Sequence, residues 1–191
     1  IKTCSNKYEI ACSLSHIKAI EIAYNNLDEG ALIFEDDIRC DYIKYWNDNV
    51  DNIINSSPLD MDCLMLFCIN NNEIKNMINM KEHYTKWNSK KWGTGCYFIN
   101  RRGMKKIINL YIKKGNIDLS YLKNGHSADV HVIYPKLKTY CYTRPLFNHQ
   151  CDDSIIHQDH VKKLHEPSLI TIKKYFQNMK ENNCCFIRKL L

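Results

Sequence analysis

Three consecutive carboxylates, Glu35-Asp36-Asp37, form the group in this chain best suited to metal binding or catalysis. They directly follow the apolar run 31–34, which predicts a short strand buried on both faces. Carboxylates crowded at the end of a buried strand repel one another, and burial penalises every uncompensated charge. Because Mg²⁺ and Mn²⁺ prefer oxygen ligands, a divalent cation would remove this cost. The triplet therefore predicts a metal site that keeps open positions for a diphosphate.

Side-chain alternation assigns different roles to the three carboxylates. If the strand continues through the triplet, Glu35 and Asp37 point to the same side and form the better pair of metal ligands. Asp36 would then contact the ribose of a bound nucleotide or reach the metal through water. A solvated acidic turn and an Asp N-cap for a following helix remain alternative interpretations. The apolar strand before the triplet favours the metal site.

Two further segments carry groups that would complete such a site. His149 lies in a polar stretch and is our candidate for the last metal ligand, because imidazole is an acceptable Mn²⁺ ligand. The alternative is a surface histidine that binds nothing. Gly93, Thr94 and Gly95 would let the backbone approach a sugar closely, since glycine has no Cβ. No Lys-Ser/Thr pair follows them, so they do not form a nucleotide phosphate loop.

The spacing of apolar residues predicts the elements that must position these groups. A capping box at Asn6 and Glu9 predicts a helix that ends near Gly30. Residues 70–91 are polar and weakly patterned, which predicts a long loop. Further strands are predicted at 63–69 and 96–99, with an edge strand at 139–142. Further helices are predicted over 43–53, from Asn100 towards Gly115, after a cap at Ser127, and after Pro167.

The order of these elements predicts the fold class. Strands that alternate with helices are typical of a layered α/β domain with a mostly parallel sheet, here expected as a single domain over residues 1–191. In such sheets ligands bind at the carboxyl ends of the strands. The acidic triplet lies at such an end, so the expected fold and the expected site agree.

The composition narrows the class of protein. The chain has 191 residues, of which 45% are hydrophobic and 25% charged, enough for a substantial buried core. Its formal net charge is +6, but lysine predominates over arginine, the residue with which nucleic-acid readers make bidentate contacts. We therefore expect no nucleic-acid partner. No apolar run reaches the length of a membrane span.

The cysteines indicate the compartment. The chain has 10 of them but no CxxC pair, and several lie inside apolar stretches, where a free thiol behaves as a small hydrophobic group. This pattern favours reduced thiols and a cytoplasmic location, and it leaves residence in the secretory lumen open.

Three blocks, taken together, resemble glycosyltransferase family 25. They are Glu9-Ile10-Ala11-Cys12-Ser13-Leu14-Ser15-His16, Ala31-Leu32-Ile33-Phe34-Glu35-Asp36-Asp37-Ile38 and Gly93-Thr94-Gly95-Cys96-Tyr97-Phe98-Ile99, and they occur in the family's order. Asp129 and the segment 145–156 extend the match more loosely. The family includes bacterial lipooligosaccharide galactosyltransferases and procollagen galactosyltransferases of animals and giant viruses.

The resemblance implies a GT-A type fold, a UDP-sugar donor, Mn²⁺ dependence and inversion at the anomeric carbon. By the resemblance, the triplet is the metal and diphosphate motif, and Ser15 and His16 line the donor side. Asp129 matches a carboxylate position of the family and is our candidate general base, with acceptor binding or helix capping as alternatives. Family members begin with a strand and a basic segment that hold the nucleotide, and nothing similar precedes Glu9 here.

The leading functional hypothesis is an inverting, metal-dependent hexosyltransferase that uses UDP-galactose or UDP-glucose. Its acceptor would be a growing glycan or a collagen-like protein bearing hydroxylysine. A degenerate domain that binds glycan or protein without turnover is the first alternative, favoured by the missing N-terminal segment. A metal-dependent nuclease or phosphodiesterase is the second, since such enzymes also cluster carboxylates around Mg²⁺.

Overall fold

A five-stranded mixed sheet forms the centre of the molecule. The computed structural model describes residues 6–123, 125–150 and 161–188. The strand order is β1-β5-β3-β8-β4, with bounds Gly30–Phe34 (β1), Cys96–Asn100 (β5), Cys63–Met65 (β3), Thr139–Tyr142 (β8) and Tyr84–Lys86 (β4). Only β3 and β8 pair in parallel, and the other three pairings are antiparallel. The layered α/β class is confirmed, but the prediction of a mostly parallel sheet is wrong.

The path of the chain explains the antiparallel pairings. Met65 lies opposite Tyr97 and Phe34 lies opposite Cys96, so β5 begins beside the ends of both β1 and β3 and runs back between them. The segments that follow β1 and β3 and the segment that precedes β5 therefore meet at the same end of these three strands. Residues 35–37, 66–69 and 93–95 lie at this end, so the acidic triplet and the glycine segment are close together.

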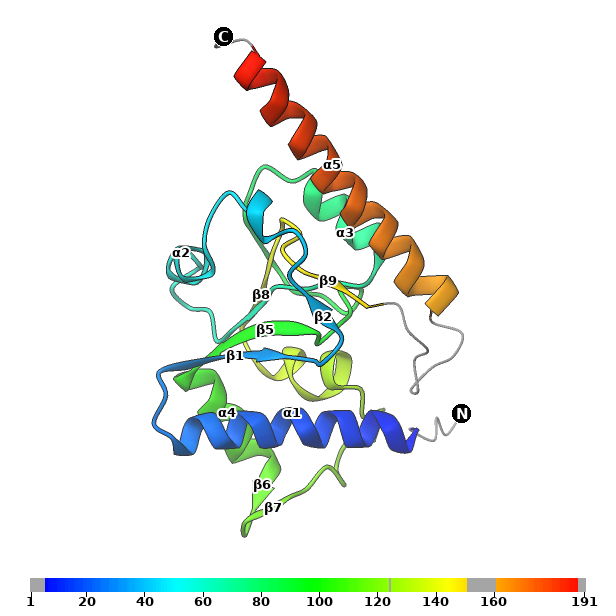
Figure 1. Cartoon of the computed structure of the whole chain (residues 1–191). Helices are drawn as coiled ribbons and strands as arrows, with labels where there is room; N and C mark the ends of the chain where they lie inside the picture. The colour runs from blue at the N-terminus through cyan, green and yellow to red at the C-terminus, as the bar shows by residue number, and fades with distance from the viewer. Residues whose placement is uncertain (1–5, 124, 151–160, 189–191) are drawn as a thin grey trace.

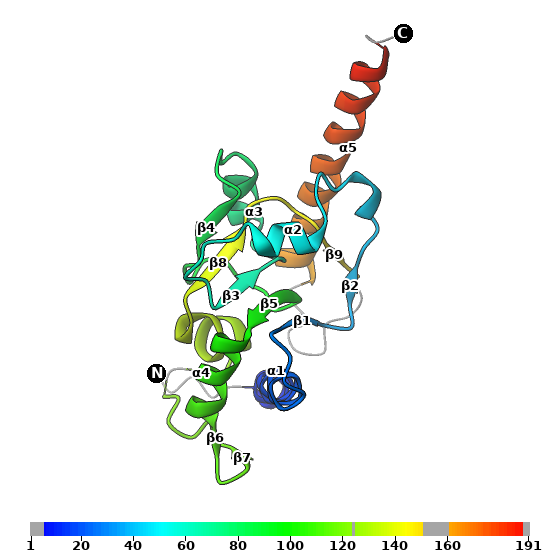
Figure 2. The same ribbon diagram turned by 90° about the vertical axis from the view of Figure 1, so that its left-hand side faces the viewer.

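Helices cover both faces of the sheet. Figures 1 and 2 show α1 (Lys7–Asn25) and α4 (Arg101–Tyr111) on one face and α2 (Val50–Asn55) on the other. Side chains of β3 alternate between the two layers: Cys63 and Met65 join the core under α1 and α4, whereas Leu64 joins the core that contains Ile53 of α2. The long helix α5 (Glu166–Arg188) packs on α3 (Asn71–Ile78).

Local capping signals are confirmed at the helix starts. Asn6 and Glu9 form the predicted capping box of α1, in which the Asn6 N–H donates to Glu9 at 3.3 Å. Asn100 caps α4 by accepting from the Gly103 N–H at 2.8 Å.

Within the described part of the chain, none of the helices combines the length and the apolar character needed to span a membrane.

Several element predictions are wrong. The segment 70–91, expected as a loop, contains α3 and β4. β8, expected at an edge, lies between β3 and β4, and β1 lies at the edge with only Ile33 buried. The helix expected over 43–53 is divided into a 3₁₀ turn, Ile43–Tyr45, and α2, because Asn49 caps a new start by accepting from the Asn52 N–H.

Two further elements end or begin differently from expectation. α4 ends at Tyr111, before Gly115, because a hairpin follows, formed by β6 (Ile112–Lys113) and β7 (Asn116–Ile117). Ser127 precedes a π-helical turn, Ala128–Val132, and its hydroxyl bonds the His131 ring at 2.8 Å instead of capping the backbone. Residues 151–156 of the segment 145–156 lie outside the described residues.

Helix α4 approaches the sheet so closely that Gly103 has no room for a side chain. A Cβ at Gly103 would lie 2.6 Å from the backbone oxygen of Asp62. We expect Gly103→Ala to lower the free energy of unfolding by about 2 kcal/mol, because the overpacking cost exceeds the better helix propensity of alanine. Urea denaturation measures this, with Lys105→Ala on the exposed face of α4 as the control. A Gly103→Ala protein as stable as the parent would contradict the close contact.

Candidate functional site

A pocket of about 550 Å³ opens at the sheet edge where β1 and β3 end and β5 begins. It gathers most of the residues that the sequence predicts for the site: Glu35, Asp37, Gly93, Thr94, Gly95, Asp129 and His149. These residues come from four separate stretches of the chain. The structure therefore brings distant segments together into one concave site.

A two-stranded ribbon brings His149 beside the acidic triplet. In it, β2 (Ile38–Arg39) pairs antiparallel with β9 (Asn148–His149), and Ile38 lies opposite His149. The Gln150 N–H donates to the Asp37 carbonyl at 2.8 Å, which extends the ladder to the triplet itself. The polar stretch that carries His149 forms part of this ribbon, and His149 is only 3% exposed, so it is not a surface histidine. The ribbon therefore fixes its position.

The His149 ring is available as a ligand. It contacts the Phe67 ring, with centroids 5.4 Å apart, and the His165 ring, with centroids 4.8 Å apart. Neither of its ring nitrogens has a hydrogen-bond partner among the described residues. Burial, together with the charge of His165, lowers the pKa of His149 to about 4. The imidazole is therefore neutral at neutral pH, as a metal ligand must be.

Asp37 places a second carboxylate in the same pocket. Its Oδ1 atom is buried and, within the part of the chain that the structure describes, has no hydrogen-bond partner. Burial raises the pKa of Asp37 to about 6, and repulsion from Glu35 and Asp36 adds to this effect. A divalent cation would satisfy the polar atoms of Asp37 and His149 that have no hydrogen-bond partner among the described residues. The donor set of this pocket therefore fits a metal ion.

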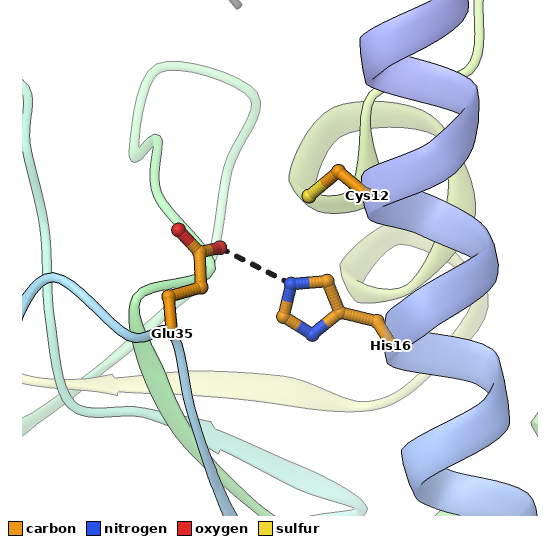
Figure 3. Close-up of side chains that lie close together, drawn as sticks. All are labelled: Cys12, His16 and Glu35. Atoms are coloured by element: carbon orange, nitrogen blue, oxygen red, sulfur yellow. Dashed lines mark hydrogen bonds and ion pairs between the residues drawn. The ribbon is translucent and has the colours of Figure 1, made fainter. Parts of the chain in front are cut away.

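Glu35 is held in place by neighbours. Its Oε1 accepts a hydrogen bond from the Thr94 hydroxyl at 2.6 Å and lies 3.1 Å from His16 Nε2 (Figure 3). The His16 Nδ1 atom is in turn 3.1 Å from the Tyr97 hydroxyl. Burial alone would raise the pKa of Glu35. The hydrogen bond and the charge of His16, together with the hydrogen bond from Thr94, instead hold this pKa below its ordinary value. Glu35 is therefore an ionised, oriented carboxylate at the pocket wall.

Asp129 orients the glycine segment. Its Oδ2 accepts from the Gly93 N–H at 2.8 Å, and its Oδ1 accepts from the Val130 N–H at 2.7 Å. Gly93 has φ of +114°, a conformation that favours glycine. A Cβ at Gly95 would lie 2.5 Å from the Ile38 side chain. The two glycines are thus required by the backbone conformation and by packing against β2, while Asp129 fixes the segment against the pocket.

Three predicted residues stand apart from the pocket lining. Ser15 is exposed, and its hydroxyl donates to the Ala11 carbonyl of its own helix at 3.0 Å. Asp36 is exposed next to the pocket. His16 is 5% exposed and reaches the site only through its bond to Glu35. The structure therefore places His16 behind the site, as a support for Glu35.

The pocket also contains residues that the sequence predictions left out. Lys163 and His165 enter it from the turn Val161–His165, and Cys12 enters it from α1. Cys12 precedes His16 by four residues on α1, a spacing that places both side chains on one helix face and was a usable signal. For Lys163 and His165 the sequence offered only a weak signal, namely a basic stretch shortly before Pro167.

Comparison with known families identifies one match. The model of the family described as Glycosyltransferase family 25 (LPS biosynthesis protein) matches residues 5–122. That range includes the acidic triplet and the glycine segment, whereas Asp129 and His149 lie beyond it. Neither the curated proteins nor the solved structures that were compared with the chain gave a match.

Proposed function

Because the chain belongs to glycosyltransferase family 25, we propose that its pocket binds a UDP-sugar together with Mn²⁺ or Mg²⁺ and transfers the hexose with inversion. Family membership implies a sugar donor and an acceptor as partners. The observation that carries the proposal is the pairing of β2 with β9, which brings into one pocket polar atoms of Asp37 and His149 that have no hydrogen-bond partner among the described residues. Galactose and glucose are the proposed sugars, and a glycan or hydroxylysine is the proposed acceptor.

Asp37 and His149 would hold the cation, with Glu35 as the third ligand. Thr94 and His16 would keep the Glu35 carboxylate oriented towards the pocket through the bonds described above. A cation bound there supplies stabilisation of the negative charge that develops on the departing nucleoside diphosphate. Lys163, which also lines the pocket, would add positive charge near that diphosphate.

Asp129 would act as the general base. In an inverting transfer, a base takes the proton of the acceptor hydroxyl as that oxygen attacks the anomeric carbon. The bonds from the Gly93 and Val130 N–H groups fix the direction of the Asp129 carboxylate, which is the preorganisation that such a base needs. Trp92, on the pocket wall, offers an aromatic surface on which a sugar ring could stack.

Thermal shift measurements with nucleotides test the proposed donor. We expect UDP, UDP-galactose or UDP-glucose to raise the melting temperature only when Mn²⁺ or Mg²⁺ is present, because ligands that bind only the folded state stabilise it. GDP and single-stranded DNA are the controls. Metal-dependent UDP binding without transfer to any acceptor would favour the non-catalytic alternative. Stabilisation by DNA with no response to UDP compounds would overturn the proposal in favour of a nuclease.

A further inference from the structure

A second group of metal-binding side chains lies at the wall of the pocket. The ligand atoms of Cys12, His16 and Glu35 all lie within 4.8 Å of one another, and Figure 3 shows the three side chains converging between α1 and the end of β1. Among the residues that the structure describes, these three offer ligand atoms that are already close enough together to share an ion. This trio shares Glu35 with the donor-site metal proposed above but contains neither Asp37 nor His149.

The fold opens one side of the trio to the pocket. Cys12 and His16 are one helical turn apart on the same face of α1, and Glu35 faces them from the end of β1. Cys12 and Glu35 both line the pocket, so a cation that enters the pocket reaches them directly. His16 is buried behind them and contributes Nε2, the nitrogen that faces Glu35.

The chemistry of the trio selects a different metal from the one expected for a nucleotide diphosphate. Thiolate, imidazole and carboxylate are the ligands of Zn²⁺, whereas Mn²⁺ and Mg²⁺ favour oxygen. Zinc with bonds of about 2.0 to 2.3 Å would hold its ligand atoms roughly 3.5 Å apart. Glu35 Oε1 and His16 Nε2 already lie 3.1 Å apart. The Cys12 Sγ atom lies within 4.8 Å of both of these atoms.

Neighbouring groups already support zinc ligation by the histidine. Zinc-bound histidines commonly donate their other ring N–H to an oxygen, which fixes the tautomer and the ring orientation. The Tyr97 hydroxyl occupies that position, 3.1 Å from His16 Nδ1. Thr94 supports Glu35 in the same way through its 2.6 Å hydrogen bond. Both outer contacts come from the segment 94–97, so one stretch of chain orients two of the three ligands.

A catalytic Cys-His-Glu triad is the competing interpretation, and the geometry opposes it. Both ring nitrogens of His16 are already engaged, one with Glu35 and one with Tyr97. Burial raises the pKa of Cys12 to about 12, and the negative charge of Glu35 adds to this effect. A thiol that keeps its proton is a poor nucleophile. Bound zinc would instead replace the thiol proton, which leaves to solvent.

We propose that Cys12, His16 and Glu35 form a Zn²⁺ site with three protein ligands and one position open to the pocket. Because Glu35 also belongs to the proposed donor site, zinc bound there would inhibit sugar transfer. The binding itself is independent of the proposed function, and only the inhibition rests on it.

Cobalt spectroscopy tests the site directly. Co²⁺ titrated into the zinc-free protein is expected to give the near-ultraviolet absorption band of a thiolate–cobalt bond, and Zn²⁺ is expected to abolish it by displacement. In Cys12→Ser the band should disappear, and Zn²⁺ affinity by titration calorimetry should fall by at least about 10-fold. Cys40→Ser, which changes an exposed cysteine outside the trio, is the matched control and should retain the band.

Two outcomes would overturn the proposal. One is a cobalt band of undiminished intensity in folded Cys12→Ser; the other is a Zn²⁺ affinity equal to that of the parent. Asp37→Ala separates this site from the donor metal, because the variant should keep the cobalt band whether or not it binds UDP. The inhibition is measured as the ratio of transfer rates with and without Zn²⁺ at saturating Mn²⁺. This ratio should approach 1 in Cys12→Ser.

Discussion

Asp37→Asn is expected to abolish Mn²⁺-dependent UDP binding and to stabilise the metal-free protein. Asparagine keeps the shape of the side chain but removes the charge that a cation needs, and the Asp37 Oδ1 atom has no other partner among the described residues. Loss of groups that merely support a ligand costs roughly 10- to 100-fold in metal affinity, so loss of a ligand itself should exceed about 100-fold. Titration calorimetry with UDP at saturating Mn²⁺ measures this loss.

The stabilisation follows from the pKa of Asp37, which folding raises from 3.8 to about 6. The folded state thus favours the protonated carboxyl. Its contribution to stability is complete below pH 3.8 and is lost as the pH rises through about 6. A fully buried group would gain about 3 kcal/mol from this difference, and solvent screening of half-exposed Asp37 reduces the gain to about 1 kcal/mol. At neutral pH without metal, Asp37→Asn should melt about 2–4 °C higher.

The same pKa predicts how donor binding depends on pH. Below about pH 6 Asp37 becomes protonated, so the Mn²⁺-dependent affinity for UDP should fall by about 10-fold near pH 5. His149, with a pKa of about 4, stays neutral over this range and adds no transition of its own.

Asp28→Asn, in the exposed turn after α1, is the control for both the binding and the pH experiment. Parent-like UDP affinity in Asp37→Asn would remove Asp37 from the metal site.

Local signals in the sequence predicted individual elements well. The capping box at Asn6 and the cap at Asn100 fix the starts of α1 and α4, because they depend on residues within one helical turn. Helix α3 was missed although Asn70 caps it and Ile74 and Met77 share one buried face. The surrounding polar residues hid that short pattern. The signal was present, but eight residues carry too little periodicity to stand out from a loop.

Strand direction and position were not predictable from local pattern. The apolar run of β1 indicated a central strand, yet β1 lies at the edge, where α1 packs beneath it and Leu32 and Phe34 remain exposed. Nothing in residues 30–34 specifies that partner β5 arrives from a segment more than sixty residues later. Pairing between distant strands depends on the whole chain, so its direction follows from tertiary packing.

The candidate site was predicted in its parts more than in its arrangement. The strand ends at Phe34, so the alternation rule did not apply to the triplet, yet Glu35 and Asp37 both line the pocket. The sequence pointed to His149 but not to the ribbon that carries it. The contact of His16 with Glu35 joins a helix to the end of a strand, and it could not be predicted from either segment alone. Site residues were recognisable by type, whereas their mutual contacts required the fold.

Asp129→Asn is expected to lower the transfer rate constant by about 10²- to 10⁴-fold, the contribution of a well-placed general base. Asparagine cannot take the acceptor proton. Its amide oxygen can still accept from the Gly93 N–H, so the glycine segment should keep its position and the affinity for UDP should change little. The amide nitrogen would then face the Val130 N–H, and loss of that hydrogen bond should cost about 1 kcal/mol of stability.

The measurement must separate a base from a residue that only positions the glycine segment. Steady-state transfer rates give kcat, and titration calorimetry gives UDP affinity for the same preparation. Asp118→Asn is the matched control, since Asp118 lies outside the pocket and likewise accepts from a nearby backbone N–H, that of Ser120 at 2.9 Å. A large fall in kcat at constant UDP affinity supports the base. Equal losses in both would assign Asp129 to positioning through Gly93, and an unchanged kcat would exclude it from catalysis.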